Sequence, residues 1–217
     1  MSVNIIQDSS LLLGSPEDIT ALSQKDSARV LVISDSHGFT AQLLYSLLEE
    51  GAKCDCLIFC GDGIGDVCSA LDRAQTDAPL AACIPPVIAL VAGNCDTEFY
   101  SLDSMRMTIQ IPLMQTLTIA GHTVLCTHGH RFSLYNGTDS LEQAAKRSNA
   151  NIVLYGHTHV AHRLQQGQLL IANPGSCARP RSNQPPCYAV LSLQKDAAYP
   201  DFTVYQISAN GSSPYTF

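Results

Sequence analysis

Histidines and carboxyl groups recur in short polar stretches that directly follow apolar runs. The stretch GHTH at 156–159, for example, ends the apolar run 152–155. In an extended backbone, side chains two positions apart point to the same side, so His157 and His159 would face one point. Two imidazoles can bind a metal ion, but they leave its coordination incomplete. The remaining ligands must therefore come from other parts of the chain.

Four further loops carry similar residue types after an apolar run. They are ISDSHG with Asp35 and His37, FCGDG with Asp62, VAGNCD with Asn94, and LCTHGH with His128 and His130. In open α/β sheets, ligand sites lie outside the carboxyl ends of the strands. The five loops therefore predict one shared site. Its candidate ligands are Asp35, His37, Asp62, Asn94, His128, His157 and His159.

This mixture of ligands indicates which metals would bind. No set of cysteines has zinc-finger spacing, which disfavours a structural zinc site. Imidazole, carboxylate and amide oxygen together suit Mn²⁺, Fe²⁺, Ni²⁺, Co²⁺ or Zn²⁺ better than Mg²⁺ alone. The candidates are too numerous for one tetrahedral ion and suit two ions about 3.5–4 Å apart that share a carboxylate. We predict two divalent metal ions per chain, with Mn²⁺ favoured over Ni²⁺, Zn²⁺, Fe²⁺, Co²⁺ and Mg²⁺.

Alternating strand and helix patterns must position these loops. In the first half, strands are predicted at 29–34, 56–60 and 86–94, and helices at 39–51 and near 66–75. In the second half, strands are predicted at 105–111, 117–129 (folded at Ala120-Gly121), 151–155, 188–194 and 201–207, with a helix at 138–149 and a hairpin around Gln166-Gly167. Continuously apolar strands are typical of strands covered on both faces. We predict an α/β fold with a two-sheet β-sandwich, mainly parallel in the first half and antiparallel in the second.

Size and composition predict a single globular domain. The chain has 217 residues, of which 46% are hydrophobic and 14% charged. Residues 1–27 are predicted to be an N-terminal extension of unknown role, in which Ser15 and Pro16 could start a helix, and 28–217 a single domain. The net charge of −7, without a run of Lys or Arg, argues against binding to extended nucleic acid.

The cysteines and apolar runs predict the compartment. The chain has nine cysteines, an odd number, with no C-x-x-C pair. We interpret them as free thiols, which indicates a reducing compartment. No apolar stretch approaches the roughly 18 residues of a membrane span, and LLL at 11–13 is too short for a signal core. We therefore predict a cytoplasmic protein without membrane contact.

The ordered motifs D-x-H, G-D, G-N, T-H-G-H and G-H-T-H resemble those of the calcineurin-like metallophosphoesterases. GNCD at 93–96 and NPGS at 173–176 narrow the resemblance to a branch of small bacterial and archaeal phosphodiesterases. The resemblance covers about 29–207 and implies a four-layer fold, two sheets flanked by helices. It implies one ion bound by Asp35, His37, Asp62 and His159, and a second bound by Asp62, Asn94, His128 and His157.

The implied reaction is hydrolysis of a small phosphodiester by a hydroxide that bridges the two ions. Many relatives have a histidine directly after the ligand asparagine, as the acid for the leaving group, where this chain has Cys95. A thiol is a poorer proton donor at neutral pH. His130 is therefore a candidate for phosphate contact or leaving-group protonation, with a role in supporting the ligands as the alternative.

Several neighbouring residues have two interpretations. Asp66 and Asp96 are expected to orient ligands or loops rather than to bind metal. Arg179 and Arg181 could contact the substrate phosphate, although solvated loop charges are the simpler interpretation. The NPGS stretch is typical of a turn, and the resemblance adds a supporting role for Asn173 and Ser176.

Two other functions remain open from the sequence. A phosphomonoesterase or phosphatase could use the same metals. A non-catalytic scaffold, like the relative in the retromer complex, could use the same fold. All seven ligand positions carry competent side chains, which favours an enzyme over a scaffold. The natural substrate, the metal used in the cell and the oligomeric state are not predicted; a homo-oligomer is one alternative, because relatives of this size commonly associate.

Overall fold

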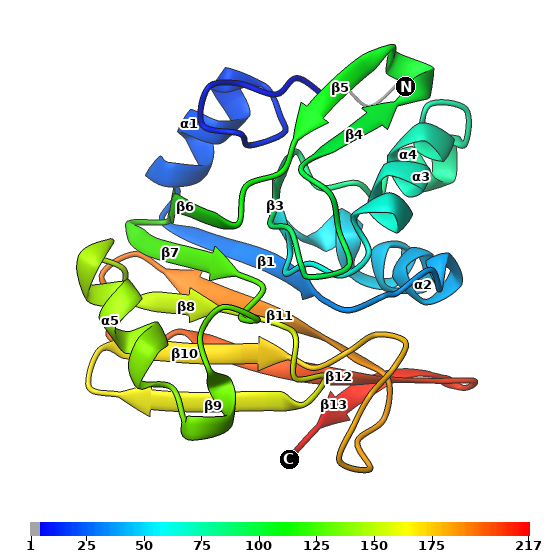
Figure 1. Ribbon diagram of the computed structural model, residues 1–217. Coiled ribbons are helices and arrows are strands. Elements are labelled where there is room, and N and C mark those ends of the chain that lie inside the picture. The colour runs from blue at the N-terminus through cyan, green and yellow to red at the C-terminus, as the bar shows by residue number, and fades with distance from the viewer. Residues whose placement is uncertain (1–4) are drawn as a thin grey trace.

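The apolar runs form strands of two β-sheets within residues 5–217, the part of the chain that the computed structural model describes (Figure 1). The six-stranded sheet has the order β13-β12-β11-β1-β2-β3. Its strands are β1 (Ser27–Ile33), β2 (Cys56–Phe59), β3 (Val87–Leu90), β11 (Cys187–Gln194), β12 (Asp201–Ser208) and β13 (Gly211–Tyr215). Strands β1, β2 and β3 are parallel, and the pairs β1–β11, β11–β12 and β12–β13 are antiparallel.

The five-stranded sheet has the order β6-β7-β8-β10-β9. Its strands are β6 (Met114–Ile119), β7 (His122–Thr127), β8 (Ile152–Leu154), β9 (Ala161–Gln166) and β10 (Leu169–Pro174). Strand β8 pairs in parallel with both β7 and β10. A separate two-stranded hairpin consists of β4 (Phe99–Leu102) and β5 (Met107–Gln110).

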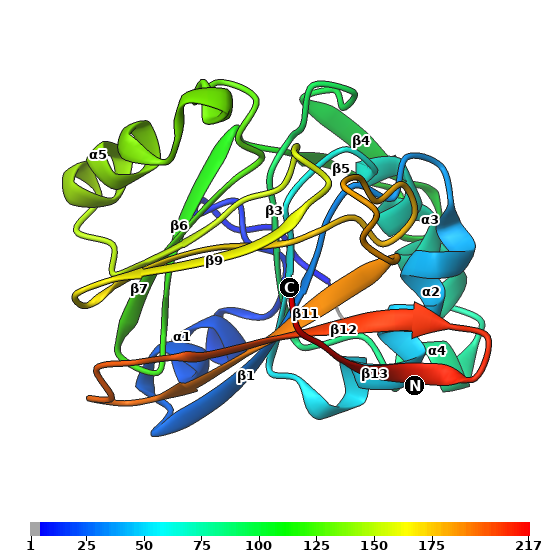
Figure 2. The same cartoon turned by 90° about the horizontal axis from the view of Figure 1, so that it is seen from below.

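Helices cover the outer faces of both sheets. They are α2 (Thr40–Glu50), α3 (Ile64–Ala74), α4 (Ala78–Ala81) and α5 (Asp139–Arg147), with short 3₁₀ turns at Gly51–Lys53, Asp103–Met105 and Leu134–Asn136. Helix α1 (Pro16–Gln24) instead places Leu22 in the core between the two sheets. Figure 2 shows the layers in order: α5, the five-stranded sheet, the six-stranded sheet, and then α2, α3 and α4. The predicted α/β sandwich flanked by helices is confirmed.

Alternate residues of the central strands pack into different cores. Val30 and Val32 of β1 belong to the apolar core between the two sheets, together with Leu154 of β8. Leu31 and Ile33 point the other way, into the core beneath α2 and α3. The strands are therefore covered on both faces, as their continuous apolar runs predict.

The predicted parallel pairing in the first half is confirmed for β1, β2 and β3, and the predicted antiparallel pairing in the second half is confirmed except at β8. Strands β11, β12 and β13 return to the first sheet and lengthen it on the antiparallel side of β1. In the second half, β8 lies in parallel between β7 and β10. Strand periodicity reports burial but not the pairing partner, which is decided by contacts distant in sequence. Helix α4 and strands β4 and β13 were also not predicted.

The N-terminal residues pack against both sheets. Ser15 caps α1 by accepting a hydrogen bond from the backbone N–H of Asp18, as its sequence predicts. Leu13 exchanges two backbone hydrogen bonds with Ile88 of β3. Leu22 of α1 accepts a backbone hydrogen bond from Ala120 in the turn between β6 and β7. The described part of the predicted extension thus covers the β3 edge and the β6–β7 turn.

The nine cysteines are free thiols, and most are buried. Among the described residues, no helix has the length and apolar character needed to cross a membrane.

Candidate metal centre

The predicted ligands converge where several strands end. Strands β1, β7 and β8 point toward the same end of the molecule in Figure 1, and β2 and β3 run parallel to β1. The loops after these five strands carry all seven predicted ligands. The site therefore lies at the carboxyl ends of strands from both sheets, as predicted.

The backbone of these loops is left-handed rather than extended. The φ angles are 58° at Asp35, 48° at His37, 56° at Asp62, 69° at His157 and 58° at His159. The expectation that His157 and His159 leave an extended strand end side by side is therefore wrong, because β8 stops at residue 154. Non-glycine residues with positive φ are uncommon and cluster at functional sites. The chain must turn sharply here to aim several side chains at one centre.

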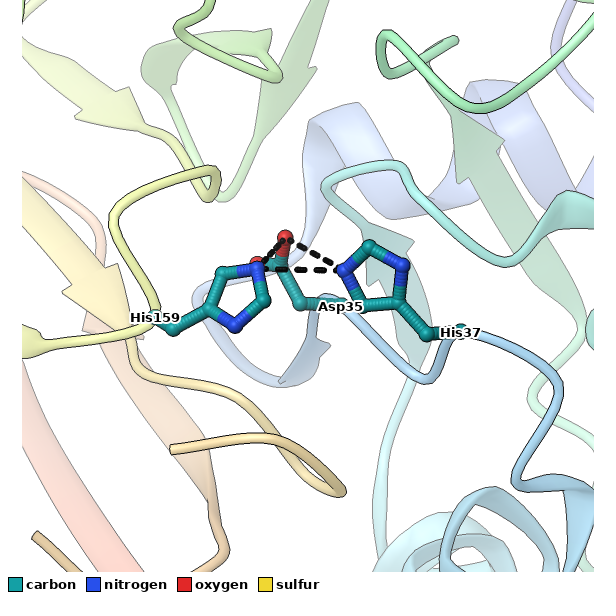
Figure 3. A group of neighbouring side chains, drawn as sticks. All are labelled: Asp35, His37 and His159. Carbon is teal, nitrogen blue, oxygen red and sulfur yellow. Dashed lines mark hydrogen bonds and ion pairs between the residues drawn. The ribbon is translucent and has the colours of Figure 1, made fainter. Parts of the chain in front are cut away.

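Asp35, His37 and His159 form the first group of the cluster (Figure 3). The Nε2 atom of His159 lies 3.2 Å from Oδ1 of Asp35 and 3.1 Å from Nε2 of His37. The distance from His37 Nε2 to Asp35 Oδ1 is 3.8 Å. This Oδ1 atom is buried and has no hydrogen-bond partner. Two imidazole nitrogens and an unpartnered carboxylate oxygen thus face a common point, as ligands of a cation do.

Asp62, Asn94 and His128 form the second group. Nε2 of His128 lies 3.4 Å from Oδ2 of Asp62 and 3.2 Å from Oδ1 of Asn94. The same Oδ2 atom of Asp62 lies 3.6 Å from Nε2 of His37, in the first group. The Asp62 carboxylate is therefore located between the two groups.

His157 and His159 join different groups. The His157 ring lies 5.1 Å from the His128 ring, centroid to centroid, whereas the His159 ring lies 4.9 Å from that of His37. The backbone N–H of His157 donates to Oδ2 of Asp35 over 3.1 Å. The imidazoles of His157 and His159 thus lie on opposite sides of the cluster.

Backbone carbonyls fix two of the imidazoles. Nδ1 of His128 lies 2.7 Å from the carbonyl oxygen of Cys60, and Nδ1 of His159 lies 2.6 Å from that of Arg179. A carbonyl only accepts, so each Nδ1 carries the hydrogen and each Nε2 keeps its lone pair for a metal ion. The donors at the centre therefore fit divalent cations bound by imidazole, carboxylate and amide oxygen.

Burial and charge oppose each other at Asp62 and His128. Burial on its own raises the pKa of Asp62, but hydrogen bonding and charge from His128, with the Cys95 backbone N–H, hold that pKa well below its usual range. Burial on its own lowers the pKa of His128, but Asp62 and Asp35 raise it overall. His159 behaves in the same way, because Asp35 outweighs burial and raises its pKa. In the absence of a cation, protons partly compensate the buried carboxylates.

Three other imidazoles of the cluster have lowered pKa values. Burial lowers the pKa of His37 and, with repulsion from His128, the pKa values of His157 and His130. Neutral imidazole is the form that binds metal.

Asp96 and Asp66 hold the loops through hydrogen bonds. Asp96 accepts from the backbone N–H groups of Asp62, Gly63, Ile64 and Gly93, at 2.6 to 3.1 Å. Asp66 accepts from the hydroxyls of Ser36 and Thr40 and from the backbone N–H of Gly38. Both carboxylates thus orient the loops that carry predicted ligands, as expected from their positions.

Two glycines allow the loops to approach closely. A Cβ atom at Gly93 would lie 2.1 Å from Oδ1 of Asp62, and one at Gly156 would lie 2.0 Å from Oγ of Ser34. No larger residue fits at either position without moving a carboxylate or its partner. Both glycines were visible in the sequence as the first letters of G-N and G-H.

The NPGS stretch supports the same loops. The Asn173 side chain donates to the carbonyl of Gly156 at 2.8 Å, and the Ser176 hydroxyl donates to the backbone carbonyl of Asp35 at 2.8 Å. The hydroxyl of Ser34, which sequence reasoning missed, donates to Oδ2 of Asp35. A serine beside an aspartate is too common to be recognised as functional without the fold.

The remaining candidates lie around the cluster. His130 is half-buried, its ring centroid is 5.4 Å from that of His128, and its Nδ1 is buried without a hydrogen-bond partner. Cys95 is exposed, and its backbone N–H donates to Oδ1 of Asp62 at 2.8 Å. The Arg179 guanidinium lies over the Phe39 ring, 5.2 Å from its centroid. Arg179 and Arg181 both line the hollow above the cluster.

Comparisons with known proteins identify the class. A family profile for the calcineurin-like phosphoesterase superfamily domain matches residues 29–196. The chain is 32% identical over 170 residues to the probable metallophosphoesterase YsnB of Bacillus subtilis, covering 78% of this chain and 86% of YsnB. It is 29% identical to the phosphodiesterase YfcE of Escherichia coli K12, covering 75% of this chain and 86% of YfcE. The chain belongs to the calcineurin-like phosphoesterase superfamily.

Solved structures agree with this assignment. A predicted phosphoesterase from Streptococcus pneumoniae is 25% identical, with a TM-score of 0.61 over 88% of this chain and 98% of that one. Vacuolar Protein Sorting 29 from Cryptosporidium parvum shares the fold at 20% identity, with a TM-score of 0.65 over 88% of this chain and 97% of that one. The protein is a phosphoester hydrolase of the metallophosphoesterase class with a four-layer α/β fold.

Proposed function

We propose that the protein is a phosphodiesterase that binds two divalent metal ions, Mn²⁺ foremost, and hydrolyses a small phosphodiester. Asp35, His37, Asp62 and His159 would bind one ion, and Asp62, Asn94, His128 and His157 the other. The observation that carries this proposal is the position of the Asp62 carboxylate, with Oδ2 3.6 Å from Nε2 of His37 and 3.4 Å from Nε2 of His128. A shared carboxylate between two ligand groups is the arrangement that a pair of ions requires.

Divalent ions at these positions supply Lewis acidity to the phosphate and lower the pKa of a water molecule toward neutrality. The carboxylates of Asp35 and Asp62 offset the positive charge. Arg179 and Arg181 line the hollow above the cluster and can donate hydrogen bonds to phosphate oxygens. A water molecule would attack phosphorus, and the P–O bond on the opposite side would break, so that the ester group leaves with its oxygen and takes up the proton lost by the water.

His130 is the proposed contact for the phosphate or the leaving group. Because burial and His128 lower its pKa, its imidazole is neutral at pH 7. A neutral imidazole donates a hydrogen bond to a phosphate oxygen more readily than it transfers a proton. The thiol of Cys95 also stays protonated, since partial burial and Asp62 raise its pKa. Good leaving groups, which need little protonation, should therefore be cleaved fastest.

The decisive experiment removes metal with a chelator and restores it with Mn²⁺, Ni²⁺, Mg²⁺ or Zn²⁺. Hydrolysis of bis(p-nitrophenyl) phosphate is then compared with hydrolysis of p-nitrophenyl phosphate. His128→Ala should abolish metal-restored cleavage. The control His162→Ala should not, because it changes a half-buried imidazole that contacts Tyr155 outside the cluster. Dominant cleavage of the monoester would favour a phosphomonoesterase instead.

A scaffold function is the second candidate, because the fold is shared with Vacuolar Protein Sorting 29. A folded, metal-loaded protein that cleaves neither ester would favour it. We also propose that the protein acts in the cytoplasm as a homo-oligomer, without binding a membrane or extended nucleic acid. Sedimentation of the purified chain would test the oligomeric state.

A further inference from the structure

Three hollows adjoin one another across the cluster. The central hollow, about 410 Å³, lies over the predicted ligands and includes Asp62, Asn94 and His157 in its wall. The polar hollow, about 440 Å³, is lined by Gly65, Ser69 and Tyr100 together with His37 and other residues of the cluster. The apolar hollow, about 290 Å³, is lined by Leu134 and Val160 together with His130, His157 and other residues of their loops.

The two side hollows each share a wall with the central one. Arg179 lines both the polar and the central hollow, and Arg181 lines both the apolar and the central hollow. The three therefore form one trough, with an arginine at each junction. A phosphate in the central hollow would have both arginines in the surrounding wall and a further hollow beyond each shared wall. A phosphodiester carries two ester groups, which would need such space on both sides.

The apolar hollow suits an uncharged group. Leu134 and Val160 supply apolar side chains that are only half-buried. Its wall contains no carboxylate, and its one arginine, Arg181, lies where this hollow meets the central one. A cavity of roughly 150 Å³ lined by apolar side chains accommodates benzene. The apolar hollow, about 290 Å³, is therefore large enough for one aromatic ring or a short aliphatic chain.

The polar hollow suits a different group. The carboxylates of Asp66 and Asp96 line it, with the hydroxyls of Ser69 and Tyr100. Two carboxylates against the single arginine of this hollow, Arg179, disfavour a second phosphate there, whereas sugar or glycerol hydroxyls could donate hydrogen bonds to the carboxylate and hydroxyl oxygens. The trough is thus asymmetric, with opposite preferences at its two ends.

We propose that the apolar hollow binds one ester group of the substrate, an aromatic or short aliphatic group, while a hydroxylated ester group occupies the polar hollow. This inference rests on the proposed phosphodiesterase function and adds a substrate class to it: an unsymmetrical diester with a single phosphate. Burial of a ring against Leu134 and Val160 would stabilise the bound diester through the hydrophobic effect.

Val160 offers the cleanest test, because it lies outside the three apolar cores of the described residues. Val160→Asp places a charge in the apolar hollow, and Val160→Asn makes its wall polar without a charge. Leu48→Asp is the control, because Leu48 is 54% exposed on α2 and lies outside these cores and outside the trough. Binding of diphenyl phosphate and dimethyl phosphate to the Mn²⁺-loaded protein is measured by calorimetry, after metal content has been matched.

The wild-type protein and Leu48→Asp should bind diphenyl phosphate at least tenfold more tightly than dimethyl phosphate. Both Val160 variants should reduce this preference at least tenfold, which corresponds to about 1.4 kcal/mol. An unchanged preference in both variants, or none in the wild type, would overturn the assignment of the apolar hollow. Diester hydrolysis is assayed separately. If ring binding depends on Val160 but no diester is cleaved with any metal, the hollow assignment stands and the phosphodiesterase proposal fails.

Discussion

Asp96→Asn should weaken the protein and its metal binding, although it replaces none of the predicted ligands. Each oxygen of the Asp96 carboxylate accepts two backbone N–H groups: Oδ2 accepts from Asp62 and Gly93, and Oδ1 from Gly63 and Ile64. An asparagine amide keeps one acceptor oxygen and turns the other position into a donor. Two of the four N–H groups therefore lose their acceptor whichever way the amide is oriented.

The expected loss of stability follows from the charge on the acceptor of these hydrogen bonds. Hydrogen bonds to a charged acceptor contribute about 1.5–3 kcal/mol each, so two of them contribute roughly 3–6 kcal/mol. Asp96 is only half-buried, so water can replace part of what is lost. We expect the free energy of unfolding to fall by about 3 kcal/mol. Metal affinity should fall by about 10- to 100-fold, since the amide no longer fixes the Asp62 loop.

Urea denaturation of the metal-free protein would measure the stability, and titration with Mn²⁺ the affinity. Asp72→Asn is the matched control, because Asp72 accepts from the exposed backbone N–H groups of Asp103 and Ser104, in the turn between β4 and β5. It should cost about 1 kcal/mol or less and leave metal affinity unchanged. If Asp96→Asn equalled this control in both measurements, the role of Asp96 in fixing the Asp62 loop would be refuted.

Three further outcomes are expected. Gly156→Ala should lower the melting temperature and metal content together, because its Cβ would lie 2.0 Å from Oγ of Ser34; wild-type values for both would contradict this. Cys95→Ser should remove most of the fast phase of thiol labelling at pH 8, because Cys95 is the exposed cysteine. A fast phase that persists would point to another thiol. Burial lowers the pKa of His162, so the unfolded chain binds its proton at a higher pH than the folded chain does, and stability should fall as the pH drops through about 6.5. His162→Gln should lessen this loss in melts at pH 5 and 7, and an identical acid loss in both proteins would exclude His162 as its source.

The sequence predicted which residues converge at the site, but not the backbone conformation of their loops or the pairing of the strands. Asp35, Asp62 and His128 follow strands whose apolar runs are easily recognised, so their convergence could be inferred. The left-handed backbone at His157 and His159 could not, because φ at a histidine is decided by what its ring must reach. The pairing of β11 with β1 was also hidden, since it joins Val30 to Leu191 across most of the chain.

The supporting contacts were predictable only in part. Asp96 and Asp66 stand close to ligands in sequence, which indicated their role. Arg179 and Arg181 looked like ordinary loop charges until the fold brought their loop over the cluster. The apolar hollow combines Leu134 and Val160 from separate loops. Val160 directly follows the predicted ligand His159, but no sequence pattern places it beside Leu134.

We expect the loops that carry the predicted ligands to fold last. Five predicted ligands have left-handed backbones, and such conformations cost on the order of 1–3 kcal/mol each for non-glycine residues. The loops can hold them only after strands of both sheets have paired on either side. Until then, the carboxylates and imidazoles are dispersed along the chain and bind a cation weakly. We therefore expect high-affinity metal binding only in a chain whose two sheets have largely assembled.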